Sequence, residues 1–213
     1  MIKAVLFDLD GTLFDSSPGI FHTANYTVKA LGFEPCDDYK QLKKFVGPPL
    51  RECFRITFGT KEEYLDKCVE VYREEYSRTG VHMLSLYDGM KSLLEKLKGR
   101  KYLTAVCTNK YEKLAKQIIQ EQGLEELFDT IQGTDEKGTI TKTDCIRNAI
   151  IELGITPDQA LMLGDTLNDQ TGAKEAGVKF CGVTYGFGFE SFSEIDGFAA
   201  SHPLDILDIV SSN

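Results

Sequence analysis

The sequence predicts an α/β fold in which a parallel sheet is interrupted after its first strand by a helical insert. Three observations lead to this prediction. An apolar run at 2–7 ends abruptly in the polar segment 8–12, and residues 16–85 read as helices throughout. From residue 86 onward, short apolar strands alternate with helices. Strands that alternate with helices form parallel sheets with right-handed crossover connections.

Capping and breaking residues delimit the helices of the insert. Ser16-Ser17-Pro18 combines a serine cap with a proline in the first turn, and Gly32 is a typical helix stop. Gly47-Pro48-Pro49 must break a helix, because proline lacks the backbone N–H group. The predicted helices are 16–31, 37–46, one that begins near Leu50, and 61–78. We interpret four aromatic residues of the insert as packing residues rather than base-stacking ones: Phe45, Phe54, Tyr64 and Tyr72.

Beyond the insert, apolar runs bounded by glycines define the remaining elements of the sheet and its helices. The predicted strands are 102–107, 129–132, 160–163 and 179–183. The predicted helices are 88–98, 111–122, 143–153, 169–176 and one that begins near Pro203. We therefore expect an α/β core made of 1–15 and 86–213, with 16–85 as a separate helical cap.

Composition excludes several classes of protein. The chain has 213 residues, of which 42% are hydrophobic, so it can bury a sizeable core. Its net charge of −9 disfavours nucleic acid as a partner, and an anionic substrate would need a local positive site. No apolar stretch approaches the length of a membrane span, and a strand follows Met1 without a signal peptide. Six scattered cysteines without a Cys-x-x-Cys pair favour reduced thiols and a cytoplasmic location.

The segment Asp8-Leu9-Asp10-Gly11-Thr12 carries the strongest functional signal. Parallel sheets bind ligands at the carboxyl ends of their strands, and this strand delivers two carboxylates there. Neighbouring carboxylates repel each other, and a cation or a shared proton relieves that cost. A simple turn is the alternative interpretation. A calcium loop is excluded, because the twelfth residue counted from Asp8 is Gly19 rather than glutamate.

Two further strands also end in polar residues. Thr108-Asn109 follows the strand 102–107, where a hydroxyl and an amide can bind phosphate oxygens or simply cap the next helix. Asp165 and Asp169 follow the strand 160–163 and lie about one helical turn apart, so both can face one cleft. Lys142 precedes the helix that leads into this strand, and it is either a surface residue or a partner of the acidic cluster.

A charge count favours magnesium at this site. Four aspartates (Asp8, Asp10, Asp165 and Asp169) carry four negative charges, and Lys142 carries one positive charge. One divalent cation reduces the net charge to −1, which allows a phosphate group to approach. Ligands that are all oxygen atoms favour Mg²⁺ over zinc. We therefore expect the four aspartates to converge around one Mg²⁺ ion.

Together these motifs resemble the haloacid dehalogenase superfamily of phosphohydrolases. Asp-Leu-Asp-Gly-Thr at 8–12 is similar to the first motif of that superfamily, and Thr108 corresponds to the second. Lys142 corresponds to the third motif, with Lys137 as a competitor because Thr143, rather than proline, follows Lys142. Gly164-Asp165-x-x-x-Asp169 is similar to the fourth. The resemblance implies a Rossmann-like core with a small helical cap inserted after the first strand.

The resemblance also implies a mechanism. Asp8 would form an aspartyl-phosphate, and Asp10 would protonate the leaving oxygen and then activate water. Thr108 and Lys142 would bind the phosphoryl group, assisted by backbone amides around Gly11 and Asn109, and Thr12 would also bind substrate. The Mg²⁺ ligands would be the carboxylates of Asp8 and Asp165 and the backbone carbonyl of Asp10, with Asp169 acting nearby.

Details of the motifs favour a phosphatase within the superfamily. Dehalogenases and phosphonate-cleaving relatives lack the second acid, Asp10, and sugar-phosphate mutases often carry valine where this chain has Thr12. Segments 46–52 and 185–188 resemble the branch that contains phosphoglycolate phosphatases and 5′-nucleotidases, and Arg51 would contact the leaving group. The expected substrate is a small phosphomonoester. A mutase of the β-phosphoglucomutase type, an inorganic pyrophosphatase and a non-catalytic phosphate-binding module remain alternatives, and we expect a monomer or weak homodimer.

Overall fold

The computed structural model describes residues 1–212 and divides the chain into two compact units. The first unit joins Met1–Phe14 to Leu86–Asn213, and the second comprises Asp15–Ser85. The connecting segments form the short strands β2 (Phe14–Asp15) and β3 (Ser85–Leu86), which pair with each other. Each unit is described separately below.

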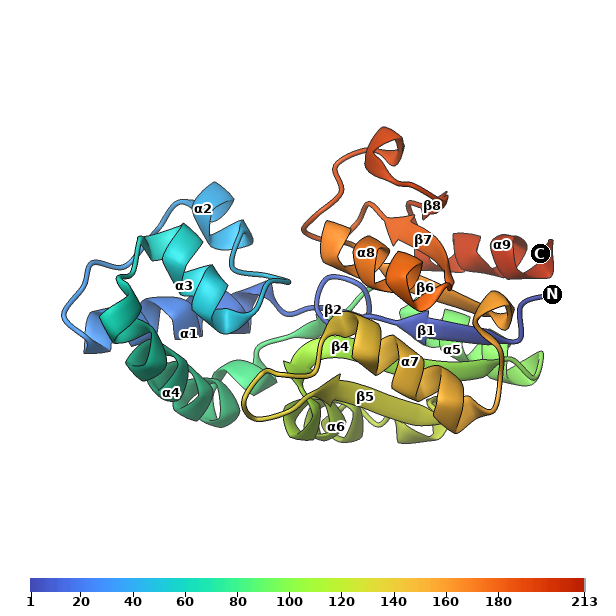
Figure 1. Cartoon of the computed structure of the whole chain (residues 1–213), viewed down its shortest axis with the longest axis horizontal. Helices are drawn as coiled ribbons and strands as arrows, with labels where there is room; N and C mark the ends of the chain where they lie inside the picture. The colour runs from blue at the N-terminus through green and yellow to red at the C-terminus, as the bar shows by residue number, and fades with distance from the viewer. Residues whose placement is uncertain (213) are drawn as a thin grey trace. The chain divides into compact units, whose positions relative to one another are not determined.

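A parallel sheet of six strands organises the first unit (Figure 1). Its strands are β1 (Ala4–Phe7), β4 (Leu103–Tyr111), β5 (Thr130–Thr134), β6 (Ala160–Gly164), β7 (Lys179–Val183) and β8 (Phe198–Ala200). They are arranged in the order β5-β4-β1-β6-β7-β8, so β1 lies between β4 and β6. The predicted parallel sheet is thereby confirmed.

Helices follow the strands of this sheet in the order that the sequence predicts (Figure 1). They are α5 (Met90–Gly99), α6 (Glu112–Glu121), α7 (Lys142–Leu153), α8 (Leu167–Ala176) and α9 (Ile206–Ser211). Short 3₁₀ helices lie at Glu125–Leu127, Pro157–Gln159, Phe192–Glu194 and Pro203–Asp205. Gly154 and Gly177 end α7 and α8 in the left-handed conformation, where glycine carries no Cβ penalty.

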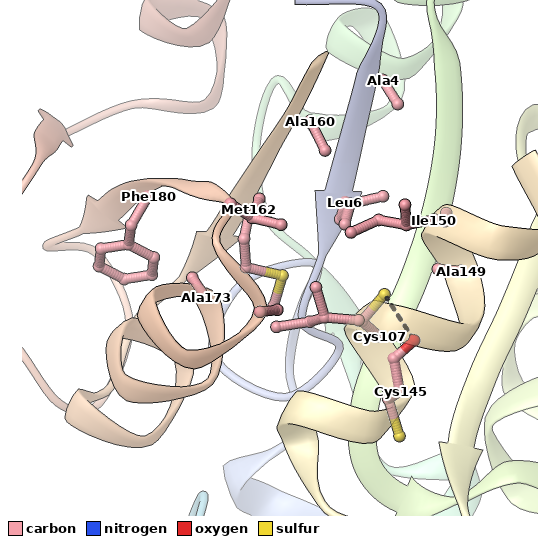
Figure 2. Close-up of a cluster of buried hydrophobic side chains, with 14 of the residues drawn as sticks. Ala4, Leu6, Cys107, Cys145, Ala149, Ile150, Ala160, Met162, Ala173 and Phe180 are labelled. Atoms are coloured by element: carbon pink, nitrogen blue, oxygen red, sulfur yellow. Dashed lines mark hydrogen bonds between the residues drawn. The ribbon is translucent and has the colours of Figure 1, made fainter. Parts of the chain in front are cut away.

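The core of this unit lies where α7 and α8 pack against the sheet, and Figure 2 shows its side chains. Leu6, Cys107 and Met162 come from three neighbouring strands and are fully buried. Ala149 of α7 and Ala173 of α8 face them. Because alanine is small, both helix backbones approach the sheet closely, and the apolar area removed from water stabilises the fold.

The register of the three central strands determines where their polar ends meet. Phe7 of β1 lies beside Val106 of β4 on one side and beside Leu163 of β6 on the other. The residues that follow these positions therefore gather at one edge of the sheet. This edge is a topological switch point, since β1 is flanked by strands that the chain reaches only later.

The second unit is a helical bundle with an aromatic core. Its helices are α1 (Ser17–Ala30), α2 (Tyr39–Lys43), α3 (Leu50–Phe58) and α4 (Glu62–Arg78), followed by a 3₁₀ helix at Gly80–His82. Phe45, Phe54 and Tyr72 are buried against one another, with ring centroids 4.9 to 6.0 Å apart. The predicted packing role is confirmed for these three residues. Tyr64 is 40% exposed and contacts the edge of Phe33 instead.

Two elements of the first unit differ from the prediction. β4 continues through Tyr111 with a register shift after Cys107, whereas we expected a strand that ends at Cys107. β8 was not predicted, because Phe198–Ala200 is too short to show an alternating pattern. Within residues 1–212, no helix combines the length and the apolar character that crossing a membrane requires. All six cysteines are free thiols.

Candidate active site

Asp8 lies directly beyond β1 in the centre of the sheet. Its amide donates a hydrogen bond to the carbonyl of Leu163, 2.9 Å away, which continues the pairing with β6. The following turn closes when the amide of Gly11 donates to the carbonyl of Phe14 at 2.8 Å. Gly11 has a φ of 83°, a left-handed conformation that favours glycine. The strand and the turn together hold the Asp8 carboxylate in a buried position.

Asp165 and Asp169 are positioned by β6 and by the start of α8. Asp165 follows the strand directly and is fully buried. Asp169 belongs to a capping box, in which its Oδ2 accepts hydrogen bonds from the Thr166 amide at 3.0 Å and the Thr166 hydroxyl at 2.6 Å. The cap leaves Asp169 Oδ1 directed away from the helix end and toward the other acids.

The structure brings three of the four predicted aspartates together. Carboxylate oxygens of Asp8, Asp165 and Asp169 lie within 4.8 Å of one another, and all three residues are buried. The carboxylate of Asp10 pairs instead with Lys110, whose Nζ lies 2.9 Å from Asp10 Oδ2. A ligand role for Asp10 through its backbone carbonyl, as the resemblance implies, stays a prediction.

Lys142 projects into this acidic group from the first turn of α7. Its Nζ lies 2.6 Å from Asp8 Oδ1, 2.8 Å from Asp169 Oδ1 and 3.0 Å from the Cys107 carbonyl oxygen. A capping box made by Thr141 and Asp144 fixes the start of α7 and therefore the origin of this side chain. The competing candidate, Lys137, lies exposed in the loop after β5. The geometry thus favours Lys142 as the cationic partner.

Burial is the largest cause of the pKa shifts of Asp8 and Asp165. It raises the pKa of Asp8 to about 7, although the neighbouring Lys142 opposes the shift. Burial raises the pKa of Asp165 well above its ordinary value, and the charge of Asp169 adds to the effect. Burial alone would lower the pKa of Lys142, but Asp169 and Asp8 reverse the direction and raise it. The ammonium group is therefore held in its charged form.

The donor set fits a hard divalent cation. Asp165 Oδ1 is a buried oxygen without a hydrogen-bond partner within residues 1–212, and such an atom is costly unless a ligand satisfies it. Three carboxylates and Lys142 carry a net charge of −2, which one divalent cation balances. The charges of Asp10 and Lys110 cancel each other. Oxygen donors in a buried acidic group suit Mg²⁺.

Of the predicted phosphate-binding residues, Thr108 and Asn109 lie in β4 and Thr12 lies in the turn after β1. Thr108 of β4 is buried, and its hydroxyl accepts a hydrogen bond from the Lys110 amide at 3.2 Å. Asn109 follows it and is partly exposed. The hydroxyl of Thr12 is buried without a partner among the described residues, so it is available to a ligand. Their roles in binding substrate stay predictions.

Arg51 has partners within the second unit. It lies on α3 and forms ion pairs with Glu62 and Asp66 of α4. These pairs raise the pKa of Arg51, chiefly through the hydrogen bond to Glu62. Any anionic substrate that Arg51 binds must compete with these two carboxylates.

The sequence-based prediction missed two features of the site. Lys110 stands directly after the predicted Thr108-Asn109 pair, but neither the register shift of β4 around it nor its ion pair with Asp10 is indicated by the sequence. The amide of Phe187 donates to Asp165 Oδ2 at 2.7 Å. Its segment, Tyr185-Gly186-Phe187-Gly188, resembles a phosphatase sequence, but that resemblance alone assigns no role to the Phe187 amide.

Comparison with known proteins shows which family the chain matches and which relatives and solved structures it resembles. The family model for haloacid dehalogenase-like hydrolases matches residues 5–183. A 5′-nucleotidase of Pseudomonas aeruginosa is 37% identical over 187 residues, which cover 87% of this chain and 84% of the relative. A phosphoglycolate phosphatase of Aquifex aeolicus is 32% identical over 216 residues, covering 100% and 98%. The crystal structure of a predicted phosphatase from Clostridium acetobutylicum covers both chains completely, with a TM-score of 0.92 and 33% identity.

Proposed function

Because the chain belongs to the haloacid dehalogenase-like hydrolase family, we propose that it is a Mg²⁺-dependent phosphatase of small phosphomonoesters. The observation that carries the proposal is the buried group of Asp8, Asp165 and Asp169 with Lys142 between two of them. Holding three carboxylates out of water serves no evident structural need, and perturbed acids of this kind are typical of active sites. The named relatives include a phosphoglycolate phosphatase and a 5′-nucleotidase, so both substrate types belong to the proposed class.

In the proposed reaction, a carboxylate oxygen of Asp8 attacks phosphorus and forms an aspartyl-phosphate as the ester P–O bond breaks. Asp10, which must be protonated when the substrate is bound, donates that proton to the departing alkoxide oxygen. Asp10 then takes a proton from water, whose oxygen attacks the phosphoryl group and releases inorganic phosphate and free Asp8. Asp8 and Asp165, with Asp169 nearby, would hold a Mg²⁺ ion, whose positive charge would reduce repulsion between the carboxylates and the incoming phosphate.

The residues around Asp8 have distinct tasks in this proposal. Lys142 lies 2.6 Å from one oxygen of Asp8. Its positive charge would also stabilise the negative charge on the phosphoryl oxygens. Asn109 and the hydroxyls of Thr108 and Thr12 donate hydrogen bonds to the same oxygens. Donors that are already oriented before the charge develops stabilise a transition state most effectively.

We propose that the helical unit 16–85 is a substrate-specificity cap. Its support is the position of the insert directly after the first motif and the basic residue Arg51 beside the Gly47-Pro48-Pro49 break. Arginine suits a second anionic group of the substrate, because its planar fork forms bidentate hydrogen bonds. We further expect a cytoplasmic monomer or weak homodimer, which light scattering during gel filtration would establish.

A phosphate-release screen tests the proposal. The panel contains phosphoglycolate, nucleoside 5′-monophosphates, sugar phosphates and pyrophosphate, each with Mg²⁺ and with EDTA. Phosphate release from monoesters that EDTA abolishes supports the proposal. An isomerised sugar phosphate without phosphate release would identify a mutase, and activity on pyrophosphate alone would identify a pyrophosphatase. Binding of Mg²⁺ and phosphate without any turnover would identify a binding module.

A further inference from the structure

The segment that follows β7 binds both the side chain and the backbone of Asp165. This segment, residues 185–189, is called here the glycine loop. The amide of Phe187 donates to Asp165 Oδ2 at 2.7 Å, and the amide of Phe189 donates to the Asp165 carbonyl oxygen at 2.9 Å. One carboxylate oxygen is thereby occupied, whereas Oδ1 keeps no partner among the described residues.

Two glycines make this contact possible. A Cβ atom on Gly186 would lie 2.3 Å from the Gly11 carbonyl oxygen and 2.4 Å from Asp165 Cβ. A Cβ atom on Gly188 would lie 2.2 Å from the Asp165 carbonyl oxygen. Backbone atoms cannot move aside as a flexible side chain can, so any residue larger than glycine would push the loop away from Asp165. The third side of Asp165 is closed by Gly11, whose own added Cβ would lie 2.3 Å from Oδ2.

A tyrosine ties the glycine loop to the turn after β1. The hydroxyl of Tyr185 donates to the Thr12 carbonyl oxygen at 3.2 Å. Burial raises the pKa of Tyr185 well above its ordinary value, so the hydroxyl keeps its proton. The loop that holds Asp165 and the turn that carries Asp8 and Asp10 are thus joined directly.

We propose that the glycine loop is a positioning device that fixes the Asp165 carboxylate with Oδ2 held by an amide and Oδ1 presented as a metal ligand. The proposal rests on the assignment of Asp165 as a Mg²⁺ ligand in the proposed function. A carboxylate already held in one orientation loses little conformational entropy when it binds a cation, and the residues that orient metal ligands typically change metal affinity 10- to 100-fold. Gly186 and Tyr185 act through Asp165 and are positioning residues.

The test measures Mg²⁺ binding to the full chain by isothermal titration calorimetry. We expect Gly186→Ala to raise the Kd for Mg²⁺ by about 10-fold or more. The matched control is Gly182→Ala in β7, where the added Cβ would meet the Ile195 side chain at 2.6 Å without touching Asp165. That control should lose thermal stability but keep its Mg²⁺ affinity within about 2-fold. A Gly186→Ala protein that is folded and binds Mg²⁺ as the unmodified chain does would overturn the proposal.

A milder pair of variants covers the case in which Gly186→Ala fails to fold. Tyr185→Phe removes one hydroxyl-to-carbonyl hydrogen bond, and Tyr102→Phe removes another of the same 3.2 Å length, to Val210, elsewhere in the unit. We expect a Kd increase of about 2- to 5-fold for Tyr185→Phe alone, with similar thermal shifts for both. Equal Mg²⁺ affinities would contradict the proposal. Because binding is measured without substrate, an inactive but Mg²⁺-binding chain would refute only the proposed function.

Discussion

Lys142 places its ammonium group between Asp8 and Asp169, and its charge opposes the rise that burial causes in the pKa of Asp8. Its side chain reaches them through a gap that α8 leaves open. An added Cβ on Gly172 of α8 would lie 2.7 Å from Lys142 Cγ, so glycine is required at that point. A charge this deeply buried is stable only because two carboxylates compensate it.

Replacing Lys142 should therefore affect both activity and stability. We expect Lys142→Met to lower kcat/KM by at least about 100-fold, because an oriented cation is lost from the phosphoryl site. The unfolding free energy should fall by about 3 kcal/mol, since the variant leaves buried acids without their partner. Steady-state kinetics and urea unfolding measure the two effects. Lys137→Met, in the exposed loop, is the control and should change neither; a reversed result would move the role to Lys137.

Lys110 is paired with the proposed general acid, Asp10. The effect on kcat of replacing Lys110 should therefore depend on the leaving group of the substrate. We expect Lys110→Met to lower kcat for an alkyl phosphate by about 10-fold or more, because proton donation to a poor leaving group needs a well-placed acid. For p-nitrophenyl phosphate the effect should stay within about 2-fold, since that leaving group needs little protonation. Lys116→Met on the surface of α6 is the matched control. Equal losses for both esters would remove Lys110 from this role.

At the level of elements, α4 contains a buried acid, Glu75, that interacts with Arg78 of the same helix and with His22 of α1. Its carboxylate pairs with Arg78 one turn later and lies 3.6 Å from His22 Nε2 of α1. The hydrogen bond from Arg78 is the main cause that lowers the pKa of Glu75 below its ordinary value. Because the folded-state pKa is lowered, this stabilisation is present above the unfolded pKa of 4.5 and is lost as the pH falls through the lower folded value.

The loss of unfolding free energy caused by Glu75→Gln should therefore depend on pH. At pH 7 we expect the unfolding free energy to fall by about 1 kcal/mol, the net contribution of a typical intramolecular hydrogen bond, because the Arg78 partner is exposed to solvent. The difference from the unmodified chain should shrink as the pH falls below 4.5 and through the lower folded-state pKa of Glu75, because the acid then becomes protonated in both states. Chemical unfolding at several pH values measures this. Glu74→Gln, exposed on the same helix, is the control; a difference independent of pH would show that Glu75 acts by packing alone.

Elements with regular apolar spacing that end at a glycine could be predicted from the sequence. The strands that carry the site show where such prediction succeeds and where it fails. The three central strands are visible as short apolar runs because both of their faces are buried. The extension of β4 through Asn109 and Lys110 could not be predicted, because its pairing with β5 is interrupted after Cys107 and resumes only at Tyr111 with a register shift. Lys110, which pairs with Asp10, lies in this interrupted stretch.

For the molecule as a whole, the acidic residues of the site could be predicted because Asp8 and Asp165 follow a strand directly, and Asp10 and Asp169 lie within a few residues of them. Their convergence is a consequence of strand order, which places β1 between β4 and β6. The division of labour among them could not be predicted: local spacing groups Asp8 with Asp10, but Asp10 pairs with Lys110 and Asp8 joins Asp165 and Asp169. Side-chain direction, rather than distance along the chain, decides the grouping.

The proposed cap makes a prediction about substrates with two anionic groups. We expect Arg51→Ala to raise KM for phosphoglycolate by about 10-fold and to leave KM for p-nitrophenyl phosphate within about 2-fold, because only the former offers a carboxylate to arginine. Arg55→Ala, which removes another partner of Glu62, is the control. Steady-state kinetics with both substrates decides the matter, and equal changes would exclude Arg51 from the leaving-group pocket.

The central claim is that Asp8 carries the phosphoryl group during turnover. The most direct measurement is an acid quench during turnover with Mg²⁺ and substrate, followed by borohydride reduction and mass spectrometry of the tryptic peptide 4–29. Reduction converts an aspartyl-phosphate to homoserine, and the account predicts homoserine at position 8 and none in Asp8→Asn, which should also release no phosphate. Homoserine at position 10, or undiminished phosphate release by Asp8→Asn, would contradict it.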